Sequence, residues 1–90
     1  MAAYSVLVRP SAAAELDHIG TKRERQRIIS RIRSLVADPR PPGCEKLAGA
    51  AGLFRVRQGH YRVVYRVDDS ARVVDVVKSG HRREVHRASE

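Results

Sequence analysis

The sequence predicts one small α+β domain over residues 1–90, in the order β-α-α-β-β-β, with an antiparallel sheet covered on one face by an N-terminal helical hairpin. Three observations favour this class. Ninety residues fit a single domain. Apolar residues recur at helical spacing up to about residue 37, and from residue 53 they recur at the alternating spacing of strands. A proline-rich segment separates the two halves.

The N-terminal half starts with a short strand and a short helix. Residues 4–8 form an apolar run that an Arg-Pro pair closes. Ser11 then stands at a natural N-cap position, because its hydroxyl can accept a hydrogen bond from a backbone N–H of the first helical turn. Apolar side chains at i, i+4 and i+7 give residues 12–19 one helical face, and Gly20 ends that helix.

A second helix follows directly. Thr21 and Glu24 match the capping box, in which a hydroxyl and a carboxylate three residues later each satisfy a backbone N–H at the start of a helix. The helix is expected to run to about Ala37, with arginines on much of its remaining surface. Its apolar residues at helical spacing are Ile28, Ile29, Ile32, Leu35 and Val36.

The C-terminal half is predicted to form three strands. Prolines and a glycine in residues 38–44 forbid a continued helix and give an extended loop. Apolar and polar residues then alternate in residues 53–58, 61–67 and 72–78, with short polar turns between them. Strands at such close spacing form an antiparallel meander, onto which the helical hairpin packs.

Charge is the strongest functional signal of the sequence. Lys and Arg outnumber Asp and Glu by 18 to 10, which gives a formal net charge of +8. An excess of this size in so short a chain favours a polyanionic partner: nucleic acid, an acidic protein or an anionic surface. Nearly all the basic residues are arginines, whose planar fork suits phosphate oxygens, so nucleic acid is the preferred interpretation. A GC-rich genome explains the ratio of Arg to Lys as well, but it does not explain the net charge.

Several classes of site and protein are excluded or disfavoured. Cys44 is the only cysteine, so the chain can form no internal disulfide and no cysteine-rich zinc site. The histidines lack the spacing of a helical metal site, and we expect neither a metal nor a cofactor. The N-terminus lacks the apolar core of a signal peptide, and no apolar run approaches the roughly 20 residues that span a bilayer. The sequence therefore predicts a cytoplasmic protein without a membrane segment.

Arginines gather on one face of the predicted sheet. In the first of the three strands, Arg55 and Arg57 point to one side, while Phe54 and Val56 point into the core. Pairing with the next strand can bring Arg62 beside them, on the side that the helices leave open. Guanidinium groups in a stripe repel one another unless anions neutralise them, which favours a track for phosphates. The alternative is that they are ordinary solvated residues of an open sheet face.

The C-terminal tail adds further basic and titratable side chains. Histidine can both give and take a proton near neutral pH, so His81 and His86 are candidates for proton transfer. They flank Arg82 and Arg83 in a strongly basic segment. On the sequence alone, solvated surface histidines are an equally good interpretation.

Two motifs, in this order, resemble a known family. They are the segment 59–65, G-H-Y-R-V-V-Y, and the segment 80–87, G-H-R-R-E-V-H-R, which together are fairly specific. With Lys46-Leu47 and the segment 53–57 before them, they resemble the RelE/ParE family of toxin–antitoxin toxins, and its RelE branch in particular. The order of elements matches over nearly the whole chain.

The resemblance implies the toxin of a type II toxin–antitoxin system, which cleaves mRNA in the ribosomal A site and so inhibits translation. In such enzymes the ribose 2′-OH attacks the adjacent phosphate without a metal ion, and basic side chains neutralise the developing charge. The positions that match the family's catalytic residues are Arg55, Arg57, Arg62, Arg82 and His86, and we expect Lys46, His81 and Arg83 to contact RNA.

Some of these positions depart from the family pattern. Relatives with lysine at the Arg55 or Arg57 position can use it as a proton acceptor, whereas a guanidinium essentially never deprotonates. His86 stands where the family usually has tyrosine, and imidazole can act as acid or base. The sequence therefore leaves the general base open, with His81 as a reserve candidate.

The resemblance also implies partners and leaves two alternatives. A cognate antitoxin, encoded next to the toxin, is expected to wrap the basic surface with acidic residues, and the ribosome and mRNA are the expected targets. One alternative is the ParE branch, which shares the fold but poisons DNA gyrase and generally lacks the basic catalytic set. The other is a nucleic-acid-binding module without chemistry. It predicts aromatic stacking groups on the exposed face, whereas Tyr61 and Tyr65 point toward the core.

Overall fold

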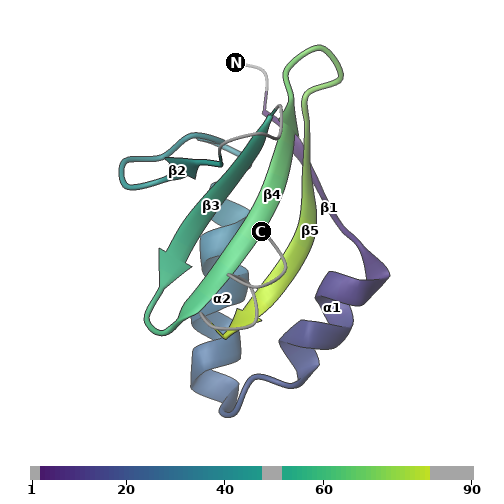
Figure 1. The fold of residues 1–90 in the computed structure, drawn as a ribbon. Helices are drawn as coiled ribbons and strands as arrows, with labels where there is room; N and C mark the ends of the chain where they lie inside the picture. The colour runs from purple at the N-terminus through teal and green to yellow at the C-terminus, as the bar shows by residue number, and fades with distance from the viewer. Residues whose placement is uncertain (1–2, 48–51, 82–90) are drawn as a thin grey trace.

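The computed structural model describes residues 3–47 and 52–81, which form helices and strands in the predicted α+β arrangement (Figure 1). The prediction of the fold class is confirmed. Neither helix in these residues has the length and apolar character needed to cross a membrane. The elements are β1 (Ser5–Val8), α1 (Pro10–Asp17), α2 (Lys22–Ser34), β2 (Glu45–Lys46), β3 (Leu53–Gln58), β4 (Tyr61–Asp68) and β5 (Val73–His81).

The strands form one sheet in the order β1-β5-β4-β3-β2. The meander of β3, β4 and β5 is antiparallel as predicted, β2 pairs antiparallel with β3, and β1 runs parallel to β5. α2 lies across one face of the sheet and contacts β3 and β4, whereas α1 lies beside the end of β5 (Figure 1). The other face of the sheet is left without a helix in the described part of the chain.

Some element boundaries differ from the sequence prediction. Ser11 is not the N-cap of α1: the helix begins at Pro10, Arg9 occupies the N-cap, and no side chain caps it. Proline favours the first helical position because its φ is already helical, and this preference prevails over the hydroxyl of Ser11. β5 continues past Lys78 to His81 because its pairing with β4 extends to the start of that strand. β2 was not predicted, since two residues are too few to show a period.

α2 begins at the predicted N-cap, Thr21, with the half of the capping box in which the hydroxyl accepts from a backbone N–H. The Thr21 hydroxyl oxygen accepts a hydrogen bond from the Glu24 N–H at 3.1 Å, and the hydroxyl lies 3.0 Å from Glu24 Oε1. The regular helix ends at Ser34, earlier than predicted, and residues 35–37 continue it with hydrogen bonds to carbonyls three residues back. α1 ends at Asp17 in the same kind of tighter turn.

The helices and the inner face of the sheet bury one apolar core. Tyr65 lies fully buried within it, and its hydroxyl donates a hydrogen bond of 2.7 Å to the Pro39 carbonyl. Burial raises the pKa of this hydroxyl, so it remains a donor at neutral pH. The bond anchors the loop that leads to β2. The core residues are Ala12, Ile19, Ile28, Ile32, Leu35, Phe54, Val56, Val63, Tyr65, Val67, Val74 and Val76.

A second set of hydrogen bonds, which we call the polar clamp, holds the same loop at the protein surface and joins Arg40, Asp69 and Tyr4. Arg40 donates hydrogen bonds of 2.7 and 3.1 Å to the two carboxylate oxygens of Asp69, and the Tyr4 hydroxyl donates one of 2.6 Å. The hydrogen bonds from Arg40 and Tyr4 lower the pKa of Asp69 to about 2. Because this folded-state pKa is depressed, the clamp contributes stability above the unfolded-state pKa and loses it as the pH falls toward about 2.

α1 covers the part of β5 that β1 does not reach. β1 pairs only with residues 73–76 of β5. Beyond a bulge, at which the pairing passes over Val77, the Ser79 N–H donates to Glu15 Oε1 at 3.4 Å, and the Ser79 hydroxyl donates to the Ala12 carbonyl at 2.8 Å. Lys78 also forms an ion pair of 2.7 Å with Glu15. A helix thus supplies the acceptors that a neighbouring strand would otherwise provide.

We expect Tyr65→Phe to lower the free energy of unfolding by about 1–2 kcal/mol, because the variant keeps the buried ring but leaves the Pro39 carbonyl without its hydrogen bond. Urea denaturation measures the change. Tyr61→Phe is the matched control, since the Tyr61 hydroxyl makes no hydrogen bond to the described residues, and its stability should change little. Equal losses in the two variants would contradict the anchoring role of Tyr65.

Candidate functional site

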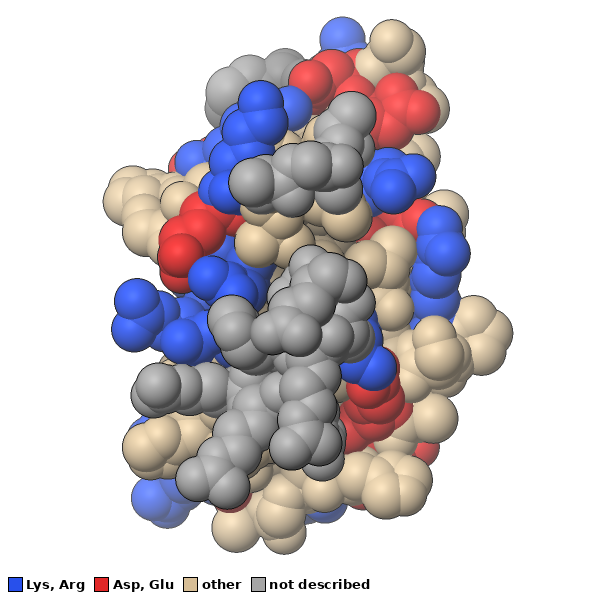
Figure 2. All heavy atoms as spheres, in the orientation of Figure 1, with Lys and Arg blue, Asp and Glu red and all other residues tan. Residues whose placement is uncertain are grey.

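The face of the sheet away from α2 carries the arginines of β3 and β4. Strand pairing places Arg57 directly across from Arg62, and Arg55 across from Val64. The β3 residues that alternate with these arginines are buried in the core on the other face. Figure 2 shows basic side chains gathered on this open face, on the side where β2 and β3 lie. The predicted geometry is confirmed, and we call Arg55, Arg57 and Arg62 the arginine cluster.

A carboxylate lies among these arginines. Antiparallel pairing of β2 with β3 brings Glu45 across from Arg55. Its carboxylate accepts a hydrogen bond of 3.0 Å from Arg55 Nη2 and lies 4.0 Å from Arg57 Nε. The hydrogen bond from Arg55, with further attraction from Arg57 and Arg62, holds the pKa of Glu45 below its ordinary value. Glu45 is therefore ionised at neutral pH.

Among the described residues, Arg55 and Arg57 share the single carboxylate of Glu45, so these two guanidinium groups keep an excess of positive charge. Only 17% of the Arg55 side chain is exposed, and its Nε is enclosed without a hydrogen-bond partner in the described residues. By contrast, 66% of the Arg57 side chain is exposed. Water screens a partly buried charge less, so Arg55 attracts an anion more strongly than a solvated arginine does. The face is therefore suited to bind an anion that contacts both side chains.

Two of the remaining predicted site residues, Lys46 and His81, lie away from this cluster. Lys46 pairs with Phe54, which places its side chain on the helix side of the sheet. His81 pairs with Tyr61 and meets its ring edge-on at a centroid distance of 5.8 Å, so it too lies on the helix side, at the end of β5. The roles proposed for them remain predictions. Outside the described residues lie Arg82, Arg83 and His86.

Glu45 is the site residue that the sequence reasoning missed. It stands in a two-residue strand beyond a Pro/Gly-rich loop, so no local period predicted its partner. The available signal was chemical: arginines that share a sheet face need a counter-ion, and Glu45 is the acidic residue closest in sequence to Arg55. In residues 3–47 and 52–81, no three His, Cys, Asp or Glu side chains are grouped so as to hold a metal ion.

A comparison with known protein families shows to which family the chain belongs. The family described as the ParE toxin of the type II toxin–antitoxin system parDE matches residues 6–86. The chain belongs to this toxin family. The toxin is also 40% identical over 37 residues to Toxin RelG of Mycobacterium tuberculosis. That alignment covers 41% of this toxin and 42% of RelG, so it spans less than half of the relative.

Solved structures of RelE toxins share the fold of this toxin. A doubly substituted Escherichia coli RelE in the free state superposes with a TM-score of 0.79 at 26% identity, over 98% of this toxin and 93% of that chain. The RelE–RelB complex of Pyrococcus horikoshii gives a TM-score of 0.78 at 28% identity, with coverages of 91% and 97%. The RelBE2 toxin–antitoxin complex of Mycobacterium tuberculosis gives 0.76 at 28% identity, with coverages of 89% and 99%.

We expect Arg55→Ala to raise the pKa of Glu45 toward its ordinary value of 4.5, because Arg55 is the main cause of the lowered pKa. Heteronuclear NMR of the Glu45 carboxyl during an acid titration measures this pKa. Since the folded-state pKa is depressed, the pair stabilises the wild type above the unfolded-state pKa and ceases to do so as the pH falls through the folded-state pKa. Arg66→Ala, on the same face of β4 but outside the cluster, should leave the pKa of Glu45 unchanged. An equal change in both variants would contradict the local cause.

Proposed function

We propose that this toxin is a ribosome-dependent endonuclease that cleaves mRNA in the cytoplasm and thereby inhibits translation. The observation that carries the proposal is the arginine cluster on the open sheet face, with the carboxylate of Glu45 beside Arg55 and Arg57. Guanidinium forks bind phosphate oxygens in two-point contacts, so this face suits the backbone of an RNA strand. The resemblance of residues 59–65 and 80–87 to the RelE branch supports RNA as the substrate.

The proposed reaction needs no metal ion. The 2′-OH of one nucleotide attacks the phosphorus of the adjacent phosphodiester, and the bond from phosphorus to the 5′ oxygen breaks. One fragment then ends in a 2′,3′-cyclic phosphate, and the other begins with a 5′-hydroxyl. One proton leaves the 2′-OH, and one must reach the departing 5′ oxygen. Negative charge grows on the non-bridging oxygens, where Arg55, Arg57 and Arg62 stabilise it.

Glu45 is our candidate for the general base. A guanidinium does not deprotonate at neutral pH, so the arginine cluster cannot take the proton of the 2′-OH. Glu45 is ionised and lies beside Arg55 and Arg57. A bound phosphate competes for both guanidinium groups and weakens the interactions that depress the pKa of Glu45. Substrate binding therefore makes this carboxylate a stronger base at the moment when a base is needed.

In this proposal the C-terminal tail supplies the general acid. His86 protonates the departing 5′ oxygen, and Arg82 adds a further positive charge, as the resemblance implies. β5 supports this arrangement, because Gly80 near its end lies across from Arg62 of the cluster. Gly80 has a φ of 150°, a conformation that favours glycine. The predicted RNA contacts beyond the reacting phosphate are Lys46, His81 and Arg83.

A cognate antitoxin is a further proposed partner. The solved relatives from Pyrococcus horikoshii and Mycobacterium tuberculosis are complexes with an antitoxin. The formal net charge of +8 favours an acidic partner, because complementary charge speeds association and selects the right surface. We propose that acidic residues of the antitoxin occupy the arginine cluster and so exclude RNA.

Poisoning of DNA gyrase is the second candidate function, since the family that matches residues 6–86 is described by its ParE member. The arginine cluster favours the endonuclease, because the resemblance associates this cluster with the RelE branch. The two functions differ in what they damage. An endonuclease breaks mRNA, whereas a gyrase poison leaves mRNA intact and accumulates cleaved DNA in the presence of gyrase.

Expression of the toxin in a bacterium should create new mRNA ends inside translated codons, which primer extension maps. Arg57→Ala and Arg62→Ala should each slow cleavage by roughly 100-fold or more, because loss of one group that stabilises developing charge costs about 10²–10³ in rate. Arg66→Ala is the matched control and should retain cleavage, since Arg66 shares the strand and the face with Arg62 but lies outside the cluster. Intact messages with arrested growth and cleaved DNA would instead support gyrase as the target.

Glu45→Gln tests the proposed base, because glutamine keeps the shape of the side chain but cannot take a proton. With purified toxin and ribosomes programmed with mRNA, we expect cleavage to fall by about 10²-fold or more. The rise of the wild-type rate with pH through the pKa of Glu45 should also disappear in the variant. Asp75→Asn, which removes a carboxylate paired with Arg9 outside the cluster, is the control. An unchanged rate and pH profile for Glu45→Gln would assign the base to another group.

A further inference from the structure

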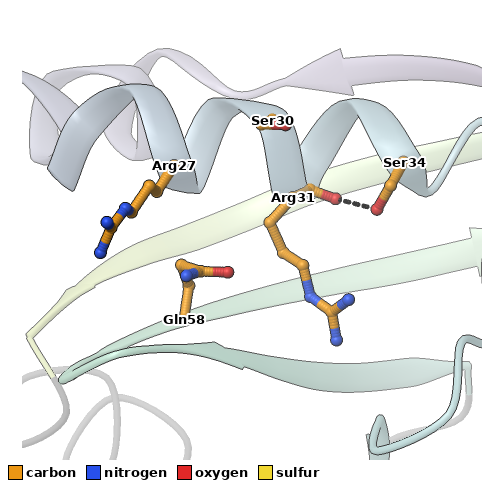
Figure 3. Close-up of a pocket in the computed structure, with 5 residues that line it drawn as sticks. All are labelled: Arg27, Ser30, Arg31, Ser34 and Gln58. Atoms are coloured by element: carbon orange, nitrogen blue, oxygen red, sulfur yellow. Dashed lines mark hydrogen bonds between the residues drawn. The ribbon is translucent and has the colours of Figure 1, made fainter. Parts of the chain in front are cut away.

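A groove between α2 and β3 plays no part in the proposed reaction (Figure 3). Two arginines from successive turns of α2 point toward the sheet, and the side chain of Gln58 lies between them (Figure 3). The side chains that line the groove all carry polar or charged groups. Its lining residues are Arg27, Ser30, Arg31, Ser34 and Gln58.

The arginines of the groove lack counter-ions in the described part of the chain. Neither Arg27 nor Arg31 forms an ion pair there. They lie four positions apart on α2, as do Arg23 and Arg27, and like charges at this spacing destabilise a helix. Arg31 is half-buried, and its enclosed Nε makes no hydrogen bond to a described residue. An anion in the groove would relieve this repulsion and offset the cost of partly burying Arg31.

The groove and the arginine cluster lie on opposite faces of the same strand end. β2 pairs with β3 only at Phe54 and Arg55, so residues 56–58 have no β2 partner. At this end of β3, Arg57 belongs to the cluster and the next residue, Gln58, lines the groove. An RNA that contacts the cluster can therefore pass around a short strand edge and meet the groove without crossing the sheet.

We propose that the α2–β3 groove binds the sugar–phosphate backbone of structured RNA, at a second site separate from the reacting phosphate. Arg27 and Arg31 contact phosphate oxygens, while the Ser30 hydroxyl and the Gln58 amide contact phosphates or ribose 2′-hydroxyls. Ser34 has a smaller part, because its hydroxyl already donates to the Arg31 carbonyl at 2.6 Å. An acidic protein segment fits less well, since stable protein interfaces bury apolar or aromatic anchors and no apolar or aromatic residue lines this groove to meet them.

The test is the binding of an RNA duplex of roughly 20 base pairs, measured by fluorescence anisotropy over a range of salt concentrations. We expect the double variant Arg27→Gln/Arg31→Gln to bind about 30-fold more weakly at about 0.1 M salt and to lower the salt slope by about 1.5, as for the loss of two phosphate contacts. The matched control is Arg33→Gln/Arg72→Gln, which removes the same charge from exposed residues outside the groove and should weaken binding less than about threefold. Thermal melting verifies that both variants are folded.

Equal weakening in the two double variants would overturn the proposal, because it would leave only a general attraction of charge. Unchanged RNA binding, with weaker binding of a glutamate-rich peptide to the groove variant, would also overturn it and assign the groove to an acidic protein partner. The duplex assay requires no cleavage. A negative result here therefore leaves the endonuclease proposal standing, and loss of cleavage in cluster variants leaves the groove proposal standing.

Discussion

Antiparallel pairing between β3 and β4 is the constraint on which the rest of the structure depends. Side chains alternate across a strand, so one register sends Phe54 and Tyr65 into the core and Arg57 and Arg62 to the open face. A slip by one residue would exchange these two sets, burying guanidinium groups and exposing the core. The same backbone hydrogen bonds therefore set both the stability of this domain and the position of its charged groups.

The open face of the sheet combines clustered arginines with one carboxylate, that of Glu45. Glu45 offsets part of the repulsion within the arginine cluster and holds Arg55 in a defined position. In the proposed function, a phosphate competes with this carboxylate for the same guanidinium groups, so binding rearranges charge within a site whose strands are already in place. Such preorganisation lowers the cost of ordering side chains when the ligand binds. β2 pairs with β3 at only two positions, so Glu45 reaches the arginines from a short strand of its own.

The sequence alone predicted the fold class, the order of the long elements and the face on which Arg55, Arg57 and Arg62 meet, because helical and strand periods extend over many residues. It predicted the wrong cap for α1, since the proline before Ser11 decides where that helix begins. It missed Glu45 and the α2–β3 groove for a common reason. Both depend on which elements become neighbours, and neither a two-residue strand nor a helix surface rich in arginine identifies its neighbour. The catalytic role of His86 rests on a resemblance in sequence and remains a prediction.

The anchor between Tyr65 and Pro39 has an evolutionary consequence. The hydroxyl of Tyr65 binds a main-chain carbonyl rather than a side chain, so it recognises the path of the loop and not its composition. The exposed Pro42 can therefore be replaced with little loss of this anchor, whereas the φ of 89° at Gly43 favours glycine there. Such a replacement changes the surface of the loop, while the strand that carries Glu45 keeps its place beside the arginines.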